Sequence, residues 1–572
     1  MAPTENEGLI PETAAERFLF QLRARGVTHF FVNAGTDFAP LVEAYARARG
    51  RDHNLFPEVC IAAHENLAVG MAHGAYLMTG RPQAVMFHVN VGTANAVCAA
   101  MNAAAERVPL IICAGRSPIY EQGMLGARNT RVSWGQEMYD QAGILREVVK
   151  WEYELRGPAH VGDVVDRAFS IAQTEPKGPI YLTLPREVLA DKLPSSASPA
   201  LDDLPIPTVA APDMQAVERL ADELAKAKFP ILSSMAGGAD PASVAALAHL
   251  CETYAIGYAE EQGRYLNLPS GHPLHLGYSL APVLREADAI CFVESDVPWI
   301  PEISSPKKDA FVAQCGTDPA FSTYPIRSHR ADLAITSGTH ALYTALDKEL
   351  AKRKGRIDMS RRERLAEMAK GVRSKRAATV EAELAKSGPI TNAYLTMMLS
   401  KVLNENCTLF NEYWATREFL NPEQPSSYFY LPATGGLGWA LPAALGAKRL
   451  RPERTFVAAI GDGTYMFSNP AACHHASQKH DLPVLTVVCN NSRWNAVLST
   501  TKLVYPTGHM RKYDSHALSD LSPSPAYEEY SKASGGYGVR VEDRAQLEQA
   551  LREALDVVER EGRQALVNVI CA

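Results

Sequence analysis

The sequence predicts an α/β fold made of three doubly wound, parallel-sheet domains. Short apolar runs alternate with longer stretches of helical period in three successive blocks of the chain. The apolar runs are continuous rather than alternating, which is typical of strands that helices cover on both faces. A chain of 572 residues is also long enough for three to four domains, each with its own core.

The first domain is expected over residues 1–192. Its predicted strands, with helical stretches between them, lie at 29–35, 83–89, 109–115 and 179–185. The stretch that comes next, 194–212, is rich in Pro, Ser and Asp, and we predict an extended linker there.

A middle domain is expected over residues 210–348, with predicted strands at 229–235 and 289–295. Residues 349–388 are rich in charge and keep a helical period. We therefore predict a solvated connecting helix there rather than a nucleic-acid-binding patch. The third domain follows over residues 389–572.

The composition argues against several classes of protein. A net charge of −7 gives no reason to expect nucleic acid or a membrane surface as a partner. No run of 18 uninterrupted apolar residues is present, so no membrane span is expected. The ten cysteines include no CxxC pair, which suits a reducing compartment. The first 18 residues lack a signal-peptide or transit-peptide pattern, so we expect a cytoplasmic protein.

The most informative stretch lies in the third domain. One apolar run ends in Gly461-Asp462-Gly463, and a second, after a helical stretch, ends in Asn490-Asn491. Two strands joined by a helix lie parallel, so both turns are expected at the same edge of the sheet. Open parallel sheets bind their ligands at that edge.

These turns offer the groups that a metal-bound diphosphate needs. The Asp462 carboxylate and the Asn491 amide supply hard oxygen ligands suited to Mg²⁺. Gly461 and Gly463 let a diphosphate approach the backbone, and a helix beginning near Asn469 leaves amides unpaired at its start. The pattern therefore predicts a metal-bridged diphosphate; two incidental turns of an α/β sheet are the alternative.

A lone carboxylate stands out in the first domain. Glu65 lies in a run of helical spacing, 62–82, among small residues such as Ala68 and Ala72. A single Glu among alanines is more often a surface residue. A carboxylate that acts on a ligand is instead expected in an apolar setting, where water does not screen its charge. The alanines around Glu65 provide such a setting.

Three motifs resemble the thiamine diphosphate-dependent enzyme superfamily. They are the Gly-Asp-Gly turn followed after 26 residues by Asn-Asn, the His-Glu pair at 64–65 with the small-residue helix after it, and the glycine-rich stretch 433–449. The resemblance implies a pyrimidine-binding first domain and a diphosphate-binding third domain. It also implies that Glu65 bonds the pyrimidine ring and promotes activation of the cofactor, while Leu437 keeps the cofactor bent.

The resemblance implies a set of cofactor contacts. Asp462, Asn491 and the backbone carbonyl of Arg493 would bind Mg²⁺. Thiamine diphosphate would contact Glu65, Asn95, Tyr413, Trp414, Gly435, Leu437, Gly461, Asp462, Gly463, Thr464, Asn491 and Trp494. Tyr413 and Trp414 stand where the family has diphosphate-binding hydroxyls, so backbone amides would carry more of that contact. For 433–449, glycine-rich packing between a strand and a helix is the alternative.

Within the superfamily, the stretches 32–44 and 148–154 resemble benzoylformate decarboxylase. This resemblance places His88 at the active-site histidine of that enzyme. The substrate pocket that it implies is formed by Gly35, Thr36, His88, Ala496 and Val497. A histidine at the carboxyl end of a buried strand can exchange protons near neutral pH. A hydrogen-bonded core histidine is the alternative.

Other features resemble acetolactate synthase. The stretch 133–151 matches a segment of that group and places Gln136 near the active site; an exposed loop amide is the alternative. The middle-domain histidine of benzoylformate decarboxylase has no counterpart in 295–304. The flavin-binding pattern of many acetolactate synthases is absent too, so FAD is not expected. The catalytic residues implied are Thr36, Glu65, His88 and Gln136.

We therefore expect an enzyme that depends on thiamine diphosphate and Mg²⁺. It would cleave or form a C–C bond next to the carbonyl of a 2-oxo acid, as a decarboxylase or as a carboligase with an aldehyde or ketone acceptor. In this family the counterparts of Glu65 and Asp462 come from different chains, so a homodimer or homotetramer is expected. A lyase of the 2-hydroxyacyl-CoA or oxalyl-CoA type and a non-catalytic homologue are the alternatives.

Overall fold

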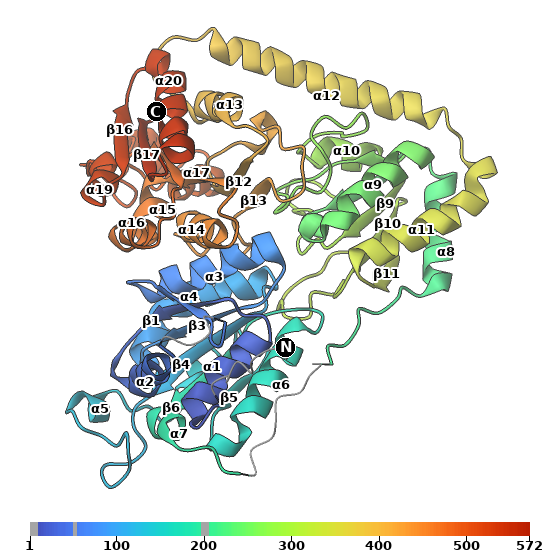
Figure 1. Ribbon diagram of the computed structural model, residues 1–572. Coiled ribbons are helices and arrows are strands. Elements are labelled where there is room, and N and C mark those ends of the chain that lie inside the picture. Colours follow the sequence, from blue (N-terminus) through green and yellow to red (C-terminus); the bar gives the residue numbers. More distant parts are fainter. Residues whose placement is uncertain (1–9, 50–53, 196–204) are drawn as a thin grey trace, which may run out of the picture.

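Three parallel β-sheets form the framework of the protein. The computed structural model describes residues 10–49, 54–195 and 205–572. All strand pairs within its sheets are parallel, and helices cover the sheets, which confirms the predicted α/β architecture (Figure 1). Residues 1–9 and residues 196–204 of the predicted linker lie outside the described ranges.

The first sheet has the strand order β2-β1-β3-β4-β6-β5. Its four central strands are those predicted from the sequence, namely β1 (His29–Asn33), β3 (Gln83–Phe87), β4 (Leu110–Arg116) and β6 (Ile180–Pro185). The edge strands β2 (Glu58–Ile61) and β5 (Glu152–Glu154) were not predicted. Their side chains are partly exposed, so they form no continuous apolar run.

Helices pack on both faces of this sheet because successive strand side chains point to opposite sides. They are α1 (Ala14–Ala24), α2 (Ala39–Ala48), α3 (Glu65–Thr79), α4 (Val89–Ala105), α5 (Val132–Gly135), α6 (Val161–Gln173) and α7 (Arg186–Ala190). Phe30 of β1 lies in a core with α1, α2 and α6, whereas Phe31 lies in a core with α3 and α4. The latter core continues into the third domain, so α3 is buried between two sheets, whereas α4 keeps one exposed face.

The middle sheet has the order β11-β10-β9-β7-β8. Its strands are β7 (Pro230–Ser234), β8 (Gly257–Tyr258), β9 (Ala289–Val293), β10 (Phe311–Gly316) and β11 (Leu333–Thr336). Its helices are α8 (Met214–Lys226), α9 (Pro241–Tyr254), α10 (Ala281–Glu286) and α11 (Thr339–Arg353). The two predicted strands of this domain correspond to β7 and β9.

The predicted charged connector contains a long helix, α12 (Arg361–Leu384), that runs from the middle domain towards the third (Figure 1). Its first residue anchors it. The buried Arg361 guanidinium donates hydrogen bonds to the carbonyls of Tyr254 at 2.6 Å and Ala227 at 2.7 Å. These carbonyls lie where α9 and α8 end and have no partner within those helices.

The third sheet has the order β13-β12-β14-β15-β17-β16. Its strands are β12 (Cys407–Glu412), β13 (Tyr428–Tyr430), β14 (Thr455–Gly461), β15 (Leu485–Asn490), β16 (Tyr537–Val541) and β17 (Ala565–Ile570). Its helices are α13 (Asn392–Val402), α14 (Ala440–Leu450), α15 (Asp462–Phe467), α16 (Pro470–Lys479), α17 (Asn495–Val504), α18 (His509–Tyr513), α19 (Tyr527–Ala533) and α20 (Arg544–Arg560). β14 and β15 pair in parallel, so both predicted turns do lie at one sheet edge.

The first and third domains meet where α3 crosses α14 (Figure 1). A Cβ atom at Gly74 would overlap the backbone of Ala443, and one at Gly446 would overlap the backbone of Met71. Only glycine leaves room for two helix backbones to approach this closely. The crossing therefore sets where α3 begins, at Glu65, relative to the third domain.

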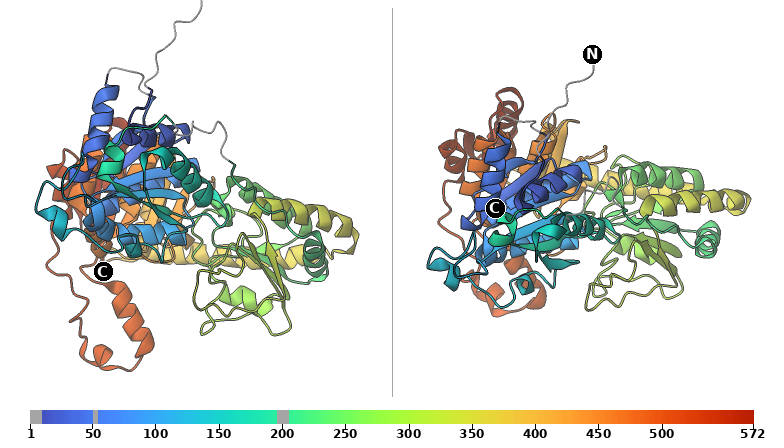
Figure 2. Two further views of the ribbon diagram at one scale, coloured as in Figure 1. Left: turned by 90° about the horizontal axis from the view of Figure 1, so that it is seen from below. Right: turned by 60° about the horizontal axis from the view of Figure 1, so that its bottom comes forward.

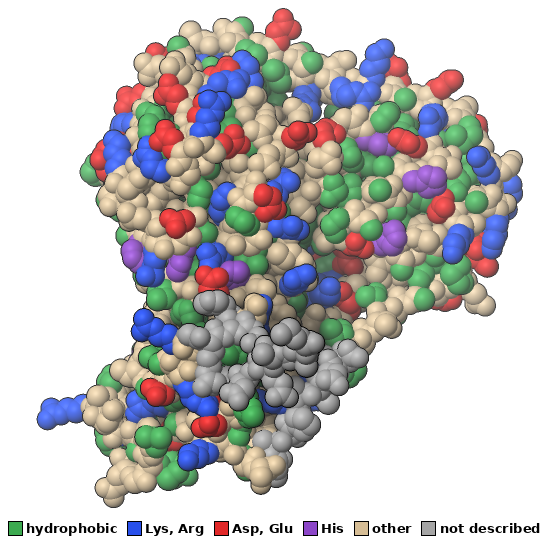
Figure 3. All heavy atoms as spheres, viewed as in Figure 1, with side chains coloured by type: hydrophobic (Ala, Val, Ile, Leu, Met, Phe, Trp, Pro, Cys, Tyr) green, Lys and Arg blue, Asp and Glu red, His purple; other side chains and the backbone are tan. Residues whose placement is uncertain are grey.

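The distribution of charged side chains on the surface is consistent with the net charge of −7. Basic and acidic side chains are interspersed over the face seen in Figure 3. Among the helices of the described ranges, none has the length and apolar character needed to span a bilayer.

Substitution of Gly74 by alanine is expected to weaken the α3–α14 crossing, because the added methyl group forces two backbones apart. We expect a loss of about 1–3 kcal/mol in the free energy of unfolding, measured by chemical denaturation. The control is Gly371→Ala in α12, where a Cβ meets no other atom within 4 Å. That variant should gain about 0.5–1 kcal/mol, because alanine favours an exposed helix interior. Equal unfolding midpoints for the two variants would contradict the role of the crossing.

Candidate active site

Glu65 begins α3 and is 8% exposed. The Asn95 side-chain amide donates a hydrogen bond to its Oε2 at 3.1 Å. A Cβ at Gly92 would lie 3.2 Å from its Oε1, so the absence of a side chain there leaves room for the carboxylate. The start of a helix also favours a negative charge. Two residues of the predicted cofactor set, Glu65 and Asn95, are thus brought together.

His88 lies between the end of β3 and the start of α4, close enough to Glu65 for their charges to interact. Its Nδ1 is 2.5 Å from Oδ1 of Asp37, and its Nε2 is 3.2 Å from the side-chain nitrogen of Gln136. A Cβ at Gly35 would overlap the imidazole ring, so glycine is required at that position. Thr36 is exposed next to this cluster. Four of the sequence-predicted residues, Gly35, Thr36, His88 and Gln136, therefore lie together.

Asp37 was not predicted from the sequence, although it directly follows Thr36. It is 3% exposed and ends up beside His88 because β1 and β3 are neighbouring parallel strands. A search for polar residues just past the end of each neighbouring strand would have found it. The hydrogen bond that Nδ1 of His88 donates to the Asp37 carboxylate raises the pKa of His88 above its usual 6.5, while burial acts in the opposite direction. His88 therefore stays protonated to a higher pH than a free histidine.

Asp462 is the first residue of α15 and is 3% exposed. Its Oδ1 accepts a hydrogen bond from the amide of Gly463 at 2.9 Å, whereas its buried Oδ2 accepts none in the described part of the chain. Burial raises the pKa of this carboxyl, and the nearby amides of Gly463, Ser492 and Arg493 act in the opposite direction. An unpaired buried carboxylate oxygen is costly, and a bound cation would satisfy it. The donor set thus fits a metal ion.

The second turn lies close to Asp462. Asn490 is the last residue of β15 and is buried, with its amide donating to Asn568 at 3.1 Å. Asn491 is half-buried beyond it, and its Oδ1 accepts a hydrogen bond from the amide of Arg493 at 3.1 Å. The Arg493 carbonyl accepts one from Asn495 at 3.0 Å. Each of these oxygens keeps a second lone pair for a ligand.

The described residues contain no group of three or more His, Cys, Asp and Glu side chains that could hold a metal ion. The predicted metal ligands are the Asp462 carboxylate, the Asn491 side-chain amide and the Arg493 backbone carbonyl. They do not form such a group, because only Asp462 belongs to one of these four residue types. Such oxygen donors suit Mg²⁺, which keeps several of its waters and takes few protein ligands.

The helix predicted to begin near Asn469 is confirmed as α16, which begins at Pro470. A short helix that was not predicted, α15, comes before it and begins at Asp462. Gly463 is packed against the ring of Trp494, which a Cβ at Gly463 would overlap. The Thr464 hydroxyl donates to the carbonyl of Gly461 at 2.9 Å.

The Leu437 turn lies before α14. Gly435 has φ +62° and Gly438 has φ +84°, backbone conformations that favour glycine, and Leu437 between them is half-buried. Tyr413 is 51% exposed, and a Cβ at Gly435 would lie 2.8 Å from its hydroxyl. Trp414, in contrast, is 7% exposed and packs in the core of the third domain. Only one of these two aromatic residues therefore lies at the turn.

Helix α17 carries Ala496 and Val497, both exposed. Together with α18 it projects from the body of the protein, as the left view of Figure 2 shows. Further along this segment Leu503 is 81% exposed and Leu518 is 90% exposed.

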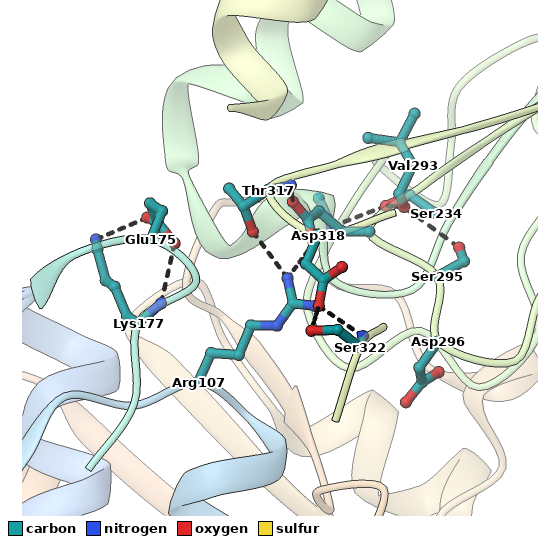
Figure 4. A network of polar contacts seen from close by, with 12 residues as sticks. Arg107, Glu175, Lys177, Ser234, Val293, Ser295, Asp296, Thr317, Asp318 and Ser322 are labelled. Carbon is teal, nitrogen blue, oxygen red and sulfur yellow. Dashed lines mark hydrogen bonds and ion pairs between the residues drawn. The ribbon is translucent and has the colours of Figure 1, made fainter. Parts of the chain in front are cut away.

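Two cavities lie where domains of the protein meet. One of about 580 Å³ lies between the domains and is lined by His64, next to Glu65, and by Asn469 and His475, which follow the glycine turn. The other, of about 570 Å³, lies at the carboxyl ends of β7, β9, β10 and β11. There Arg107 reaches from the first domain to Glu294 at 2.9 Å and Thr317 at 2.8 Å in the middle domain (Figure 4).

Family models match both of the domains that carry these residues. The family model described as thiamine pyrophosphate enzyme, N-terminal TPP binding domain, matches residues 12–144. The model described as thiamine pyrophosphate enzyme, C-terminal TPP binding domain, matches residues 411–569. The two ranges contain Glu65 and His88 in one case and Leu437, Asp462 and Asn491 in the other.

Individual relatives span almost the whole chain. A sulfoacetaldehyde acetyltransferase of Rhodobacter capsulatus is 27% identical over 95% of this chain and 92% of its own length. A benzoylformate decarboxylase of Pseudomonas aeruginosa is 26% identical over 83% of this chain and 85% of its own. A solved thiamine diphosphate-dependent 4-hydroxybenzoylformate decarboxylase of Rhodococcus jostii has the same fold, with a TM-score of 0.77, 20% identity and coverage of 98% and 99%.

The likeness to benzoylformate decarboxylase that the sequence predicts is confirmed by these relatives. With both cofactor-binding domains matched in order, the chain belongs to the thiamine diphosphate-dependent enzyme superfamily.

Proposed function

We propose that this protein is a thiamine diphosphate- and Mg²⁺-dependent enzyme that breaks or forms a C–C bond beside the carbonyl of a 2-oxo acid. The observation that carries the proposal is the buried Oδ2 of Asp462, which lacks a partner in the described part of the chain. It lies beside the Asn491 turn, at the sheet edge where a metal-bound diphosphate would sit.

The cofactor would be held by both turns of the third domain and by the first domain. Asp462, Asn491 and the carbonyl of Arg493 would bind Mg²⁺. Gly463 and Thr464 would face the diphosphate, Leu437 would support the bent cofactor, and Glu65 would hold its pyrimidine ring. When bound, the cofactor supplies an acceptor for the electron pair released by C–C cleavage.

The chain itself supplies charge and protons. Because Asp37 occupies Nδ1 of His88, Nε2 is the ring nitrogen left to exchange a proton; in the neutral ring it accepts a hydrogen bond from the Gln136 side-chain nitrogen. A protonated His88 beside the cofactor would also attract the carboxylate of a 2-oxo acid. Gly35 and Thr36 border this proton donor, and Ala496 and Val497 would add the small apolar wall of the pocket.

Two fates are open to the acyl fragment: protonation to an aldehyde, or transfer to an aldehyde or ketone acceptor. We favour transfer, because residues 295–304 contain no histidine to act as a second proton donor. Gln136 is in contact with His88 and could orient an acceptor instead. The relative from Rhodobacter capsulatus is named as an acetyltransferase, which supports the same choice. A CoA-dependent lyase is an outcome of the test below.

The active site is proposed to lie between two chains, in a homodimer or a pair of dimers. Within one chain, the Glu65 carboxylate accepts a hydrogen bond from Asn95, and the Asp462 carboxylate accepts one from the amide of Gly463. The apolar segment around α17 and α18, with Leu503 and Leu518 largely exposed, offers a surface that a second copy would cover.

The reaction can be tested with a panel of 2-oxo acids, with and without aldehyde acceptors, in the presence of thiamine diphosphate and Mg²⁺. Mass spectrometry should detect a ligated or acyl-transfer product that needs both substrates. Aldehyde alone would favour simple decarboxylation, and turnover only with CoA thioesters would favour the lyase. No product from any donor, with the cofactor bound, would contradict the proposal. Absorbance in the flavin band tests the expectation that FAD is absent.

Asp462→Asn should weaken Mg²⁺-dependent uptake of thiamine diphosphate, because a neutral amide replaces the anionic ligand. We expect a loss of about 100-fold in affinity, equivalent to roughly 2.7 kcal/mol, measured by calorimetry of the apoprotein. The control is Asp481→Asn, an exposed aspartate at φ +52°, where asparagine fits the same backbone. Unchanged uptake by the Asp462 variant would remove this residue from the metal site.

Asp37→Asn should lower the pKa of His88, since the carboxylate that stabilises the imidazolium is lost. Activity that needs protonated His88 is present below its pKa and is lost as the pH rises through it. The alkaline limb of the kcat/KM profile should therefore move to lower pH, by about one unit. Asp140→Asn, which changes an exposed aspartate paired with Arg146, should leave the limb in place. If the alkaline limb of the profile lay at the same pH in the wild type and in the Asp37→Asn variant, this role of Asp37 would be contradicted.

A further inference from the structure

We propose that Asn102 is a positioning residue: it holds the Leu437 turn from the first domain, so that helix α4 joins this turn to the Glu65–His88 cluster. The inference rests on the proposed function, because it assigns Leu437 to cofactor support. It concerns contacts made by the chain itself, 334 residues apart in sequence.

The Asn102 side chain is 3% exposed and uses both of its functional groups. Its Nδ2 donates to the carbonyl of Gly436 at 2.8 Å, and its Oδ1 accepts from the amide of Gly436 at 3.0 Å. The Thr434 hydroxyl donates to the same Oδ1 at 2.7 Å. The Asn102 amide thus makes one N–H···O bond in each direction with Gly436, as two paired residues of neighbouring strands do. An amide side chain can make this pair because it carries a donor and an acceptor side by side.

A second buried side chain holds the other side of the turn. Glu412, the last residue of β12, is 0% exposed and accepts hydrogen bonds from the amides of Gly438 at 2.7 Å, Trp439 at 3.0 Å and Ala440 at 2.8 Å. These amides belong to the start of α14 and have no partner within the helix. Leu437 thus lies between a residue bound by Asn102 and a residue bound by Glu412.

The turn has little freedom to move between these contacts. A Cβ at Gly438 would lie 2.5 Å from the backbone of Phe467 and Ser468, and one at Gly436 would lie 2.6 Å from Asn102 itself. With one side packed against the third domain and the other against α4, the turn is fixed by its neighbours. The place of Leu437 is therefore set before any cofactor binds.

Helix α4 connects this turn to Glu65 and His88 of the same chain, which in the proposed dimer belong to the second active site. His88 precedes its first turn, and Asn95 donates to Glu65. Asn102 comes seven residues later, two helical turns or about 10 Å along the axis, on the same face of the helix. A shift of α4 would move the Glu65 contact and the Leu437 turn together.

A purely structural role in docking the two domains is the other explanation. Docking, however, is already provided by the crossing of α3 and α14, to which Asn102 does not belong. Its bonds go to the turn that carries Leu437. The two explanations differ in what they predict for cofactor affinity at a given loss of stability.

The test uses the full chain with Asn102→Ala and Asn102→Asp. The aspartate keeps the acceptor but sets an oxygen against the Gly436 carbonyl. Both variants should bind thiamine diphosphate at least about tenfold more weakly at saturating Mg²⁺, as expected for the loss of buried hydrogen bonds. Calorimetry gives the affinity, and initial rates give the KM for the cofactor separately from kcat. Affinity within about twofold of wild type would overturn the inference.

Asn267→Ala is the matched control. Asn267 is also a buried asparagine that bonds a glycine turn, through Gly238 at 2.8 Å and Ser234 at 3.1 Å, but it lies in the middle domain. It should lower the unfolding midpoint about as much as Asn102→Ala and leave cofactor affinity unchanged. Equal losses of affinity in both variants would favour the structural role. A wild-type protein that does not take up the cofactor would instead refute the proposed function, so the two failures are distinguishable.

Discussion

The close crossing of α3 and α14 is the contact on which the rest of the site depends. Each helix begins at a functional position, α3 at Glu65 and α14 just after Leu437. Because Gly74 and Gly446 let the two backbones approach closely, the helix starts are set relative to one another. The small residues that make α3 look unremarkable as a sequence are thus what positions its carboxylate.

Four buried carboxylates in and around the site differ in their hydrogen-bond partners, and these differences indicate their roles. Asp37 is paired with a histidine, and Glu65 accepts a bond from an amide side chain. Glu412 is bonded by three backbone amides, and burial raises its pKa to about 7. Of these four, only Asp462 has a fully buried oxygen without a hydrogen-bond partner in the described part of the chain. Since a buried charge must be compensated, that oxygen is the natural place for an added cation.

The middle domain is tied to the first by buried charges rather than by apolar packing alone. Arg264 lies between Glu106 of the first domain, at 2.5 Å, and Asp296 of the middle domain, at 2.9 Å. Arg107 makes a second link to Glu294. The pairs of Arg264 are almost fully buried, so removal of either partner would leave a buried charge without compensation. The middle domain is therefore held in place next to the helices that form the site.

The sequence by itself determined the fold class, the four central strands of the first sheet, the strands β7, β9, β14 and β15, and the two turns that carry Asp462 and Asn491. It could do so because continuous apolar runs and glycine turns are local signals. The edge strands, the additional helix α15 and the opposite environments of Tyr413 and Trp414 depend on neighbours far away in the chain. Asp37, Asn102 and Glu412 gain their importance only from contacts with residues 51, 334 and 26 positions away. Such pairs have no fixed spacing, so only the tertiary structure could decide them.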